Sequence, residues 1–292
     1  MLIGSLVAIV TPMSDDGNID YSAFKKLIDW HVESGTKGIV VAGTTGESAT
    51  LTVEEHTSLI EAAVAHAAGR VPIIAGTGAN STTEAIELSS HAKRVGASYS
   101  LSVVPYYNKP SQEGLYLHFR TIAEAVDIPL ILYNVPSRTV ADLANETVFR
   151  LAEIENIIGI KDATADMGRG SELISKTPED FAVYSGDDAS FLPLMMLGSQ
   201  GVISVTANIV PKQMQEVCDA VQSKDFQLAK KINDRLHMLH NNLFVEANPI
   251  PVKWGLKRMG RIGEGIRLPL TSMNTQFEQI ILESLADAKV LV

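Results

Sequence analysis

The chain has 292 residues, of which 46% are hydrophobic and 20% charged, and its formal net charge is −10. The first two values are ordinary for a globular protein with a large core. The acidic balance, with lysines and arginines scattered along the chain, argues against nucleic-acid binding, because contact with a phosphate backbone requires clustered basic residues.

Cysteine content and hydropathy limit the compartment. Cys218 is the only cysteine, so an intrachain disulfide and a multi-cysteine zinc site are excluded. The apolar N-terminus, MLIGSLVAIVTP, lacks the basic region and the cleavage-type sequence of a signal peptide. No stretch approaches the roughly 18 apolar residues that a membrane span requires. We therefore expect a cytoplasmic protein that does not contact membranes.

Short apolar runs alternate with longer amphipathic segments along most of the chain. The runs predict eight strands, at Leu6–Val10, Gly38–Val41, Pro72–Ala75, Tyr99–Val103, Pro129–Tyr133, Ile157–Lys161, Phe181–Ser185 and Gly201–Ser204. The segments between them carry helix start signals. Two pairs have capping-box spacing, Thr52 with Glu55 and Ser81 with Glu84. Pro211 suits the first turn of the helix after the eighth strand.

Continuous apolar strands separated by helices are typical of a parallel sheet that is covered on its faces. Eight such units, ending near residue 222, predict an α/β fold, a closed (β/α)8 TIM barrel over residues 1–222. Residues 223–292 predict a C-terminal appendage of three helices. Asn248–Pro251 separates its first two helices, and Leu268–Pro269 precedes the third.

In barrels of this kind the chemistry lies at the carboxyl ends of the strands. Here those ends are rich in small, polar and aromatic residues, which suits a small oxygen-rich ligand. The six segments are GTTGES (43–48), PYYNKP (105–110), YNVPSRT (133–139), GIKDAT (159–164), SGDDAS (185–190) and ISVTAN (203–208).

Lys161 is the most informative of these residues. It closes the apolar run 157–160, so its stem starts inside the barrel and its amine reaches the carboxyl end. Desolvation favours a neutral amine, the form that attacks a ketone. The structural alternative is a lysine that extends into solvent or pairs with Asp162. Lys109, in the loop after the fourth strand, is the only serious competitor.

Other strand-end residues have both a chemical and a structural interpretation. The segment 43–46 offers backbone N–H groups and hydroxyls for a carboxylate, or is a plain turn. Tyr133 could relay a proton, or simply pack. Tyr106 and Tyr107 point opposite ways if the backbone is extended. Arg138 could clamp a carboxylate with two hydrogen bonds, or be solvated.

Two partial motifs carry little weight. Gly76-Thr77-Gly78 begins like a dinucleotide fingerprint, but Ser81 replaces the third glycine and the segment lies in the middle of the barrel. His237 and His240 have helical i, i+3 spacing without the carboxylates of a metal site. The sequence therefore argues against NAD and against a metal-dependent aldolase.

Taken together, the loops resemble the dihydrodipicolinate synthase and N-acetylneuraminate lyase family of Schiff-base barrels. The resemblance covers essentially the whole chain, the helical appendage included. Eight motifs appear in order: GTTGESATL, AGTGANST, PYYNKPSQEGLY, ILYNVPSRT, GIKDAT, SGDDAS, GVISVTAN and NPIPVKW. One of them would be weak, but eight at the expected barrel positions are highly specific.

The resemblance is closest to the synthase branch, which implies condensation of pyruvate with L-aspartate 4-semialdehyde on the route to diaminopimelate and lysine. It implies that Lys161 carries pyruvate as a Schiff base. The other implied roles are a proton relay of Thr44, Tyr133 and Tyr107, with Tyr107 supplied across a subunit interface. Thr45 and its loop would hold the pyruvate carboxylate, Arg138 the carboxylate of the semialdehyde, and Gly186 and Ile203 would line the site.

The resemblance implies neither a metal nor a nicotinamide cofactor, because an imine is itself the electron sink. It also implies a homotetramer, built as a dimer of dimers. In lysine-sensitive relatives an interface pocket binds lysine, and its positions here are Ser48, Ala49, His56, Asn80, Glu84 and Tyr106. Val53 replaces a histidine found in some relatives, which removes one polar contact.

Two alternatives stay open on the sequence. One is another pyruvate-dependent class I lyase or aldolase that acts on a sugar acid. The other is a non-catalytic sensor of pyruvate or lysine. Arg138 and the YYNKP segment argue against the first alternative, and the intact set of chemically matched residues argues against the second.

Overall fold

The structure is a computed structural model, and it describes residues 1–290. Eight parallel strands close into a barrel in chain order, so the last strand pairs with the first. The strands are β1 (Gly4–Ala8), β2 (Gly38–Val41), β3 (Ile73–Gly76), β4 (Tyr99–Val103), β5 (Leu130–Asn134), β6 (Ile157–Asp162), β7 (Ala182–Ser185) and β8 (Gly201–Ser204). The predicted (β/α)8 barrel is confirmed, with strand ends that differ from the expected ones by at most two residues.

The barrel closes between β1 and β8 because two glycines lie side by side. Gly4 pairs with Gly201 in the parallel ladder. A Cβ atom on Gly201 would lie 1.9 Å from the main-chain oxygen of Gly4. Glycine at this position therefore permits the backbone approach that joins the two strands.

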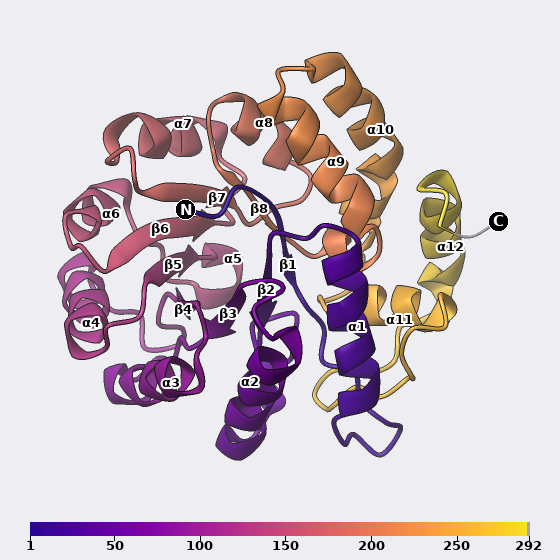
Figure 1. The fold of residues 1–292 in the computed structure, drawn as a ribbon, viewed down its shortest axis with the longest axis horizontal. Helices are drawn as coiled ribbons and strands as arrows, with labels where there is room; N and C mark the ends of the chain where they lie inside the picture. The colour runs from indigo at the N-terminus through magenta and orange to yellow at the C-terminus, as the bar shows by residue number, and fades with distance from the viewer. Residues whose placement is uncertain (291–292) are drawn as a thin grey trace.

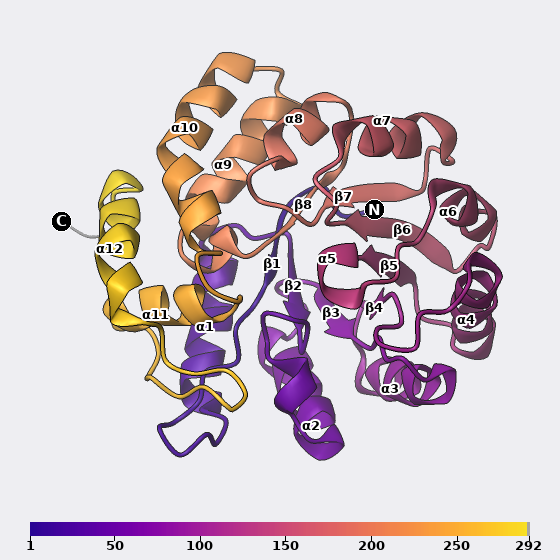
Figure 2. The same cartoon turned by 180° about the vertical axis from the view of Figure 1, so that it is seen from behind.

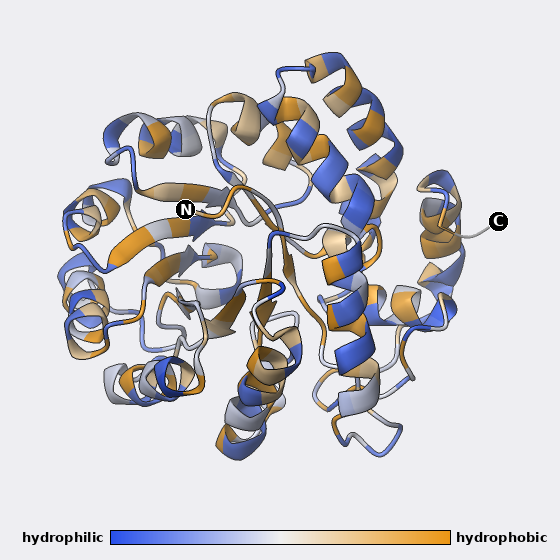
Figure 3. Ribbon diagram, in the orientation of Figure 1, coloured by the Kyte–Doolittle hydropathy of each residue, from blue (hydrophilic) through white to orange (hydrophobic). Residues whose placement is uncertain are grey.

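Most of the helices cover the outside of the barrel, as Figure 1 shows, and the short α5 lies at one of its mouths. They are α1 (Tyr21–Glu33), α2 (Val53–Ala67), α3 (Thr82–Val95), α4 (Gln112–Ala125), α5 (Pro136–Thr139), α6 (Asn145–Ala152), α7 (Met167–Lys176), α8 (Phe191–Met196) and α9 (Pro211–Gln222), with the short 3-10 turns η1 (Ser48–Thr50) and η2 (Thr206–Asn208). In Figure 3 most of these helices carry both hydrophobic and hydrophilic stretches, as amphipathic helices packed on a sheet should.

The start signals of the helices are confirmed in two cases and half confirmed in the third. Thr52 and Glu55 form the reciprocal capping box of α2. Pro211 occupies the first turn of α9. The Ser81 hydroxyl caps the N–H of Glu84 at the start of α3, but no return bond from Glu84 to the Ser81 backbone forms in the described part of the chain.

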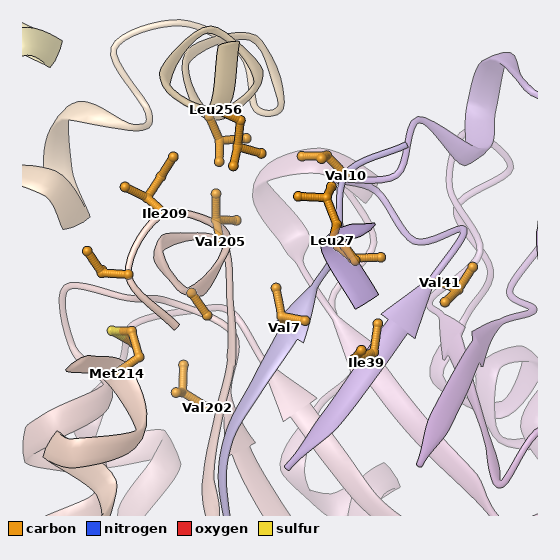
Figure 4. Close-up of a cluster of buried hydrophobic side chains, with 14 of the residues drawn as sticks. Val7, Val10, Leu27, Ile39, Val41, Val202, Val205, Ile209, Met214 and Leu256 are labelled. Atoms are coloured by element: carbon orange, nitrogen blue, oxygen red, sulfur yellow. The ribbon is translucent and has the colours of Figure 1, made fainter. Parts of the chain in front are cut away.

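The C-terminal appendage packs on the barrel rather than standing apart. It contains α10 (Phe226–Asn242), α11 (Ile250–Arg258), η3 (Thr275–Phe277) and α12 (Glu278–Asp287). Leu256 of α11 belongs to the same buried cluster as Val7 of β1 and Val202 of β8, and Figure 4 shows it beside Val10. The three predicted helices are present, although α12 begins ten residues after Leu268–Pro269. The boundary at residue 222 stays a prediction.

The two mouths of the barrel differ in what covers them. Figure 1 shows the N-terminus in front of the strands, and Figure 2 shows α5, which follows β5, on the opposite side. The carboxyl ends of the strands therefore lie at the mouth seen in Figure 2. Among residues 1–290, no helix is long and apolar enough to cross a membrane.

Candidate active site

Lys161 lies near the end of β6 with its side chain inside the barrel. It stands opposite Tyr133 of β5 and Tyr184 of β7 in the parallel ladders. Because side chains alternate between the two faces of a strand, residues at this level of the barrel share the inner face. Lys161 is only 6% exposed, and its Nζ lies 4.2 Å from the centroid of the Tyr133 ring.

The structural alternative, in which Lys161 pairs with Asp162, is not observed. Asp162 accepts from the Thr164 hydroxyl at 2.5 Å and from the Asn134 amide at 3.3 Å. Burial raises the pKa of Asp162, against the influence of the Thr164 hydrogen bond and the Arg169 charge. Across residues 1–290, no carboxylate forms an ion pair with Lys161.

Two cavities meet at Lys161. The larger has a volume of about 590 Å³, and most of the predicted site residues line it: Thr44, Thr45, Tyr133, Arg138, Lys161 and Gly186. The smaller has a volume of about 40 Å³ and shares the walls formed by Thr44, Thr45, Tyr133 and Lys161. Ala8, Val40 and Leu101 add apolar side chains to it. One polar chamber and one small, largely apolar recess thus flank the same amine.

The loop after β2 presents Thr44 and Thr45 to these cavities. A turn closes it, since the N–H of Gly46 donates to the carbonyl of Gly43 at 3.0 Å. Thr45 is buried, and its Oγ1 accepts from the side-chain amide of Asn248 at 2.9 Å. Two residues further on, Glu47 has a left-handed φ of 58° and pairs with Lys253 of α11.

Arg138 lies on α5 and reaches the rim of the larger cavity. Its Nη2 donates to the main-chain oxygen of Asn248 at 3.2 Å. Within residues 1–290 the Arg138 side chain makes no other hydrogen bond. The rest of its guanidinium is therefore available to a ligand. Arg138 and Thr45 therefore both contact Asn248, Arg138 at its main-chain oxygen and Thr45 at its side-chain amide.

Gly186 and Ile203 differ in how closely they approach the site. A Cβ atom on Gly186 would lie 3.0 Å from Cε of Lys161 and 2.7 Å from Cβ of Ala163. Gly186 therefore leaves the space that the lysine side chain occupies. Ile203 is buried in the barrel interior, packed in the same cluster as Tyr133, while Val205, two residues on, lines the larger cavity.

Tyr107 lies outside both cavities. Its side chain is 90% exposed, and its φ of 74° places its backbone in the left-handed region. The Tyr106–Tyr107 segment is thus bent, not extended as the opposite-facing arrangement assumes. Tyr106 lines a third cavity, whereas Tyr107 lines none of these three cavities. Lys109, the competing lysine, has a left-handed φ of 48° and does not line the cavities at Lys161.

The third cavity, of about 360 Å³, gathers the predicted lysine-binding residues. Ser48, Ala49, His56, Glu84 and Tyr106 line it, and Asn80 donates to the main-chain oxygen of Tyr106 at 3.3 Å. Thr44, Arg138 and Asn248 form a wall shared with the larger cavity. The two spaces are therefore neighbours.

Electrostatics in the third cavity suit a cationic ligand. Burial lowers the pKa of His56, although its Nε2 lies 2.7 Å from the carbonyl of Gly76, a contact that opposes the shift. A neutral imidazole then donates to that carbonyl. Burial and the charge of Glu84 raise the pKa of Tyr106, which keeps the phenol protonated. Glu84 is the acidic side chain at this end of the cavity.

Sequence reasoning missed Asn248 and Lys253. Both lie in the NPIPVKW segment, for which the sequence indicates a break between two helices and a resemblance to the family, but no role in the site. Lys253 is 5% exposed, and burial lowers the pKa of its ammonium while Glu47 opposes that shift. The lysine in an otherwise apolar stretch was the available signal, because a buried lysine requires a partner.

Other candidates that the sequence discounted have structural roles. Gly76 and Gly78 line the small recess. Within residues 1–290, no group of three or more His, Cys, Asp or Glu residues is placed to hold a metal ion. Cys218 is buried on α9, and burial raises the pKa of its thiol.

The fold and this site define a class: a (β/α)8 barrel with a buried lysine amine at the carboxyl end of β6, which has no ion-pair partner within residues 1–290 and opens to a polar cavity. The chain belongs to the dihydrodipicolinate synthetase family, whose model matches residues 1–288. It is 63% identical to the 4-hydroxy-tetrahydrodipicolinate synthase of Nitrosospira multiformis over 98% of this chain and 96% of that one.

Solved structures agree with this relationship. A crystal structure of the chloride-inhibited dihydrodipicolinate synthase of Acinetobacter baumannii, complexed with pyruvate, is 57% identical, with a TM-score of 0.98 over 100% of both chains. A crystal structure of the synthase of Cyanidioschyzon merolae with lysine bound is 40% identical, with a TM-score of 0.96 over 99% of both chains.

Proposed function

We propose that this protein is a lyase that condenses pyruvate with L-aspartate 4-semialdehyde to 4-hydroxy-tetrahydrodipicolinate, an early step towards diaminopimelate and lysine. The single observation that carries the proposal is the buried Lys161 amine, without a carboxylate partner and beside Tyr133, at a cavity that also holds Thr45 and Arg138. Membership of the family and the relatives' activity support it.

Lys161 supplies the covalent step. Its neutral Nζ attacks the ketone carbon of pyruvate, and loss of water leaves an imine. The imine nitrogen withdraws electrons, so a proton leaves the methyl carbon and an enamine forms. The enamine carbon then bonds to the aldehyde carbon of the semialdehyde, the aldehyde oxygen gains a proton, and the imine is restored. Water or an internal amine finally releases the product from Lys161.

Thr44, Tyr133 and Tyr107 form the proposed proton relay. The Tyr133 ring stands next to the Lys161 amine, where the proton transfers of imine formation take place. A phenol is a poor proton carrier alone at neutral pH, and a chain of hydroxyls lets it exchange protons without holding a charge. Thr44 lines all three cavities, so it connects the space beside Tyr133 with the cavity that Tyr106 lines.

Two carboxylates require two separate binding positions. Thr45 and the loop 43–46 hold the carboxylate of pyruvate, with Gly186 leaving room for the lysine stem. Arg138, on the rim of the larger cavity, holds the carboxylate of the semialdehyde through its paired donors. The small recess, with Ala8, Val40 and Leu101 in its wall, suits the methyl group of pyruvate.

Borohydride trapping tests the proposal. Reduction in the presence of pyruvate should give a stable adduct on Lys161, located by peptide mass spectrometry and absent from a Lys161→Ala variant. A folded protein that forms no adduct would exclude the Schiff base and favour a pyruvate or lysine sensor. A trapped protein that cleaves a sugar acid but ignores L-aspartate 4-semialdehyde would establish a different lyase.

The proposed assembly is a homotetramer built as a dimer of dimers, in which Tyr107 serves the site of a neighbouring subunit. Its 90% exposure supports this role. Mixing Lys161→Ala with Tyr107→Phe subunits tests it, because a mixed dimer contains one site with an intact Lys161 and an intact Tyr107. Activity that returns on mixing supports the exchange. Mixed dimers as inactive as the two parents would place Tyr107 outside the relay.

We further propose that lysine inhibits the enzyme by binding in the third cavity. Its ammonium would meet Glu84, with Ser48, Ala49, His56, Asn80 and Tyr106 around it. The absent return bond from Glu84 to Ser81 leaves the carboxylate free for that contact. Rates measured across a lysine titration should fall, and a Glu84→Gln variant should shift the midpoint to higher lysine. Activity unchanged at saturating lysine would remove the proposal.

A cytoplasmic location completes the proposal. Cys218, the one cysteine of the chain, lies on α9 and is buried. The fold thus relies on no intrachain disulfide, which suits a reducing compartment. Fractionation of the native host, with antibody detection, checks the location.

A further inference from the structure

Asn248, directly ahead of α11, joins two parts of the site that are far apart in the sequence. Its side-chain Nδ2 donates to Thr45 Oγ1 at 2.9 Å, and its main-chain oxygen accepts from Arg138 Nη2 at 3.2 Å. It is 5% exposed and lies in the wall between the larger cavity and the third cavity. One residue of the appendage thus contacts both groups assigned to substrate carboxylates.

The direction of the bond to Thr45 determines what that hydroxyl offers. A threonine hydroxyl has one hydrogen to donate and lone pairs to accept with. Since the Asn248 amide donates to Oγ1, the hydrogen of the Thr45 hydroxyl is left for another acceptor. Thr45 is buried and lines the cavities at Lys161, where a carboxylate is such an acceptor.

The appendage fixes the same loop a second time. Lys253, one turn along α11, pairs with Glu47, two residues after Thr45. Both partners are buried, and Glu47 holds a left-handed backbone conformation. The segment that carries Thr45 is therefore held at two points by residues 248–253, so the position of Asn248 relative to Thr45 is well defined.

We propose that Asn248 is a positioning residue, which orients the Thr45 hydroxyl as a donor toward the pyruvate carboxylate and supports Arg138 through its main-chain oxygen. The inference rests on the proposed function and adds a specific role for the C-terminal appendage: it sets the hydrogen-bond polarity of the pyruvate site. Asn248 itself forms no bond to reacting atoms.

An isosteric exchange separates this role from a merely structural one. Asn248→Asp keeps the shape but offers only acceptors when ionised, so the Thr45 hydroxyl would turn towards the aspartate and away from the substrate. The KM for pyruvate should rise about 100-fold, and about tenfold in Asn248→Ala, with smaller changes in kcat. Lower pH should narrow the gap between Asn248→Asp and the wild type, because a protonated aspartate can donate again. For Asn248→Ala the gap should not depend on pH.

Asn156→Asp is the matched control. The Asn156 amide donates to the carbonyls of Ala123 and Val126 at 3.1 and 2.8 Å, ahead of β6 and away from the cavities. This variant should lose stability without a change in KM. If Asn248→Asp does not fold, the cycle of Asn248→Ala with Thr45→Val decides the matter. The double variant should then be hardly worse for pyruvate than Thr45→Val alone.

Two results would overturn the inference. One is a wild-type KM for pyruvate in folded Asn248→Asp. The other is full additivity of Asn248→Ala and Thr45→Val. Borohydride trapping distinguishes these from failure of the proposed function. If the wild-type protein forms no adduct, the proposed function itself is wrong. If the wild type and Asn248→Asp both form the adduct, with the same half-saturating concentration of pyruvate, then only the proposed role of Asn248 is wrong.

Discussion

The active-site mouth and the junction between the barrel and α11 each contain a buried lysine, and the two lysines have different surroundings. Lys161 is 6% exposed and Lys253 is 5% exposed. Lys253 forms an ion pair with the buried Glu47, whereas Lys161 stands over the Tyr133 ring without a carboxylate partner in the described chain. Equal burial therefore does not mean equal chemistry.

The difference lies in what each environment permits. A buried ammonium with a carboxylate partner remains charged and structural, because losing either partner would strand the other charge. A buried amine without a counter-charge, beside a cavity that a ligand can enter, is accessible for covalent chemistry. The presence or absence of a counter-charge thus separates the structural lysine from the reactive one.

Removing Lys161 should have the largest effect on activity and little effect on stability. Lys161→Met should lower kcat/KM for the condensation by about 10⁴-fold or more, because the covalent route is lost. The free energy of unfolding should not fall, since no ion pair is broken and a buried polar group is removed. Urea denaturation and steady-state kinetics check both. A loss of stability above about 2 kcal/mol would mean that Lys161 also holds the barrel together.

Removing Lys253 should give the opposite pattern. Lys253→Met should lower the free energy of unfolding by about 3–5 kcal/mol, because Glu47 is left buried and unpaired. Adding Glu47→Gln should restore much of that loss. Urea unfolding at one fixed protein concentration measures both variants. Equal losses in the single and double variants would contradict a charge-based explanation and favour packing.

Gly186→Ala narrows the space around the reactive lysine alone. The new methyl group would meet Cε of Lys161 at 3.0 Å and Cβ of Ala163 at 2.7 Å. The rate of pyruvate adduct formation should fall about 10²-fold, since displacement of the amine by a fraction of an ångström disturbs the attack geometry. Gly168→Ala, in the first turn of α7, is the control and should react normally. An unchanged rate in Gly186→Ala would show that the lysine stem can move aside.

The outermost ion pair of the junction should contribute least. Arg267 holds both carboxylate oxygens of Glu55, at 2.7 and 2.6 Å, and lowers the pKa of Glu55 from 4.5 to about 2. The stabilising effect is therefore complete above the unfolded pKa near 4.5 and is lost as the pH falls towards 2. Glu55→Gln should cost about 1 kcal/mol at pH 7, after allowance for screening by solvent.

Urea unfolding of wild type and Glu55→Gln between pH 7 and pH 3 checks this last prediction. The difference in the free energy of unfolding should shrink as the pH falls below about 4.5. A difference that stays constant with pH would show that the effect of Glu55 does not come from its charge.

Much of the fold and of the site could be predicted from the residues. The apolar runs fixed eight strands, since continuous apolar stretches separated by helices favour a covered parallel sheet. Lys161, Tyr133, Thr44, Thr45 and Arg138 could be named because barrel chemistry gathers at the carboxyl ends of strands, and each of these residues follows or ends one.

Ile203 and Tyr107 show where such reasoning stopped. The role of Ile203 at the site stays a prediction: its side chain packs inside the barrel with Tyr133, and Val205, two residues on, lines the larger cavity. The position of Tyr107 depends on a loop in which its own backbone is left-handed. Strand periodicity carries no information on such a conformation.

The sequence by itself determined the barrel, the order of its elements and the position of Lys161 near the end of its strand, because these follow from local periodicity and from the position of a residue on its own strand. Only the tertiary structure decided that Asn248 meets Thr45 and that Lys253 meets Glu47. Each pair is separated by more than 200 residues of sequence. Partners so distant are selected by packing of α11 on the barrel, and one sequence carries no local signal of which distant groups that packing brings together.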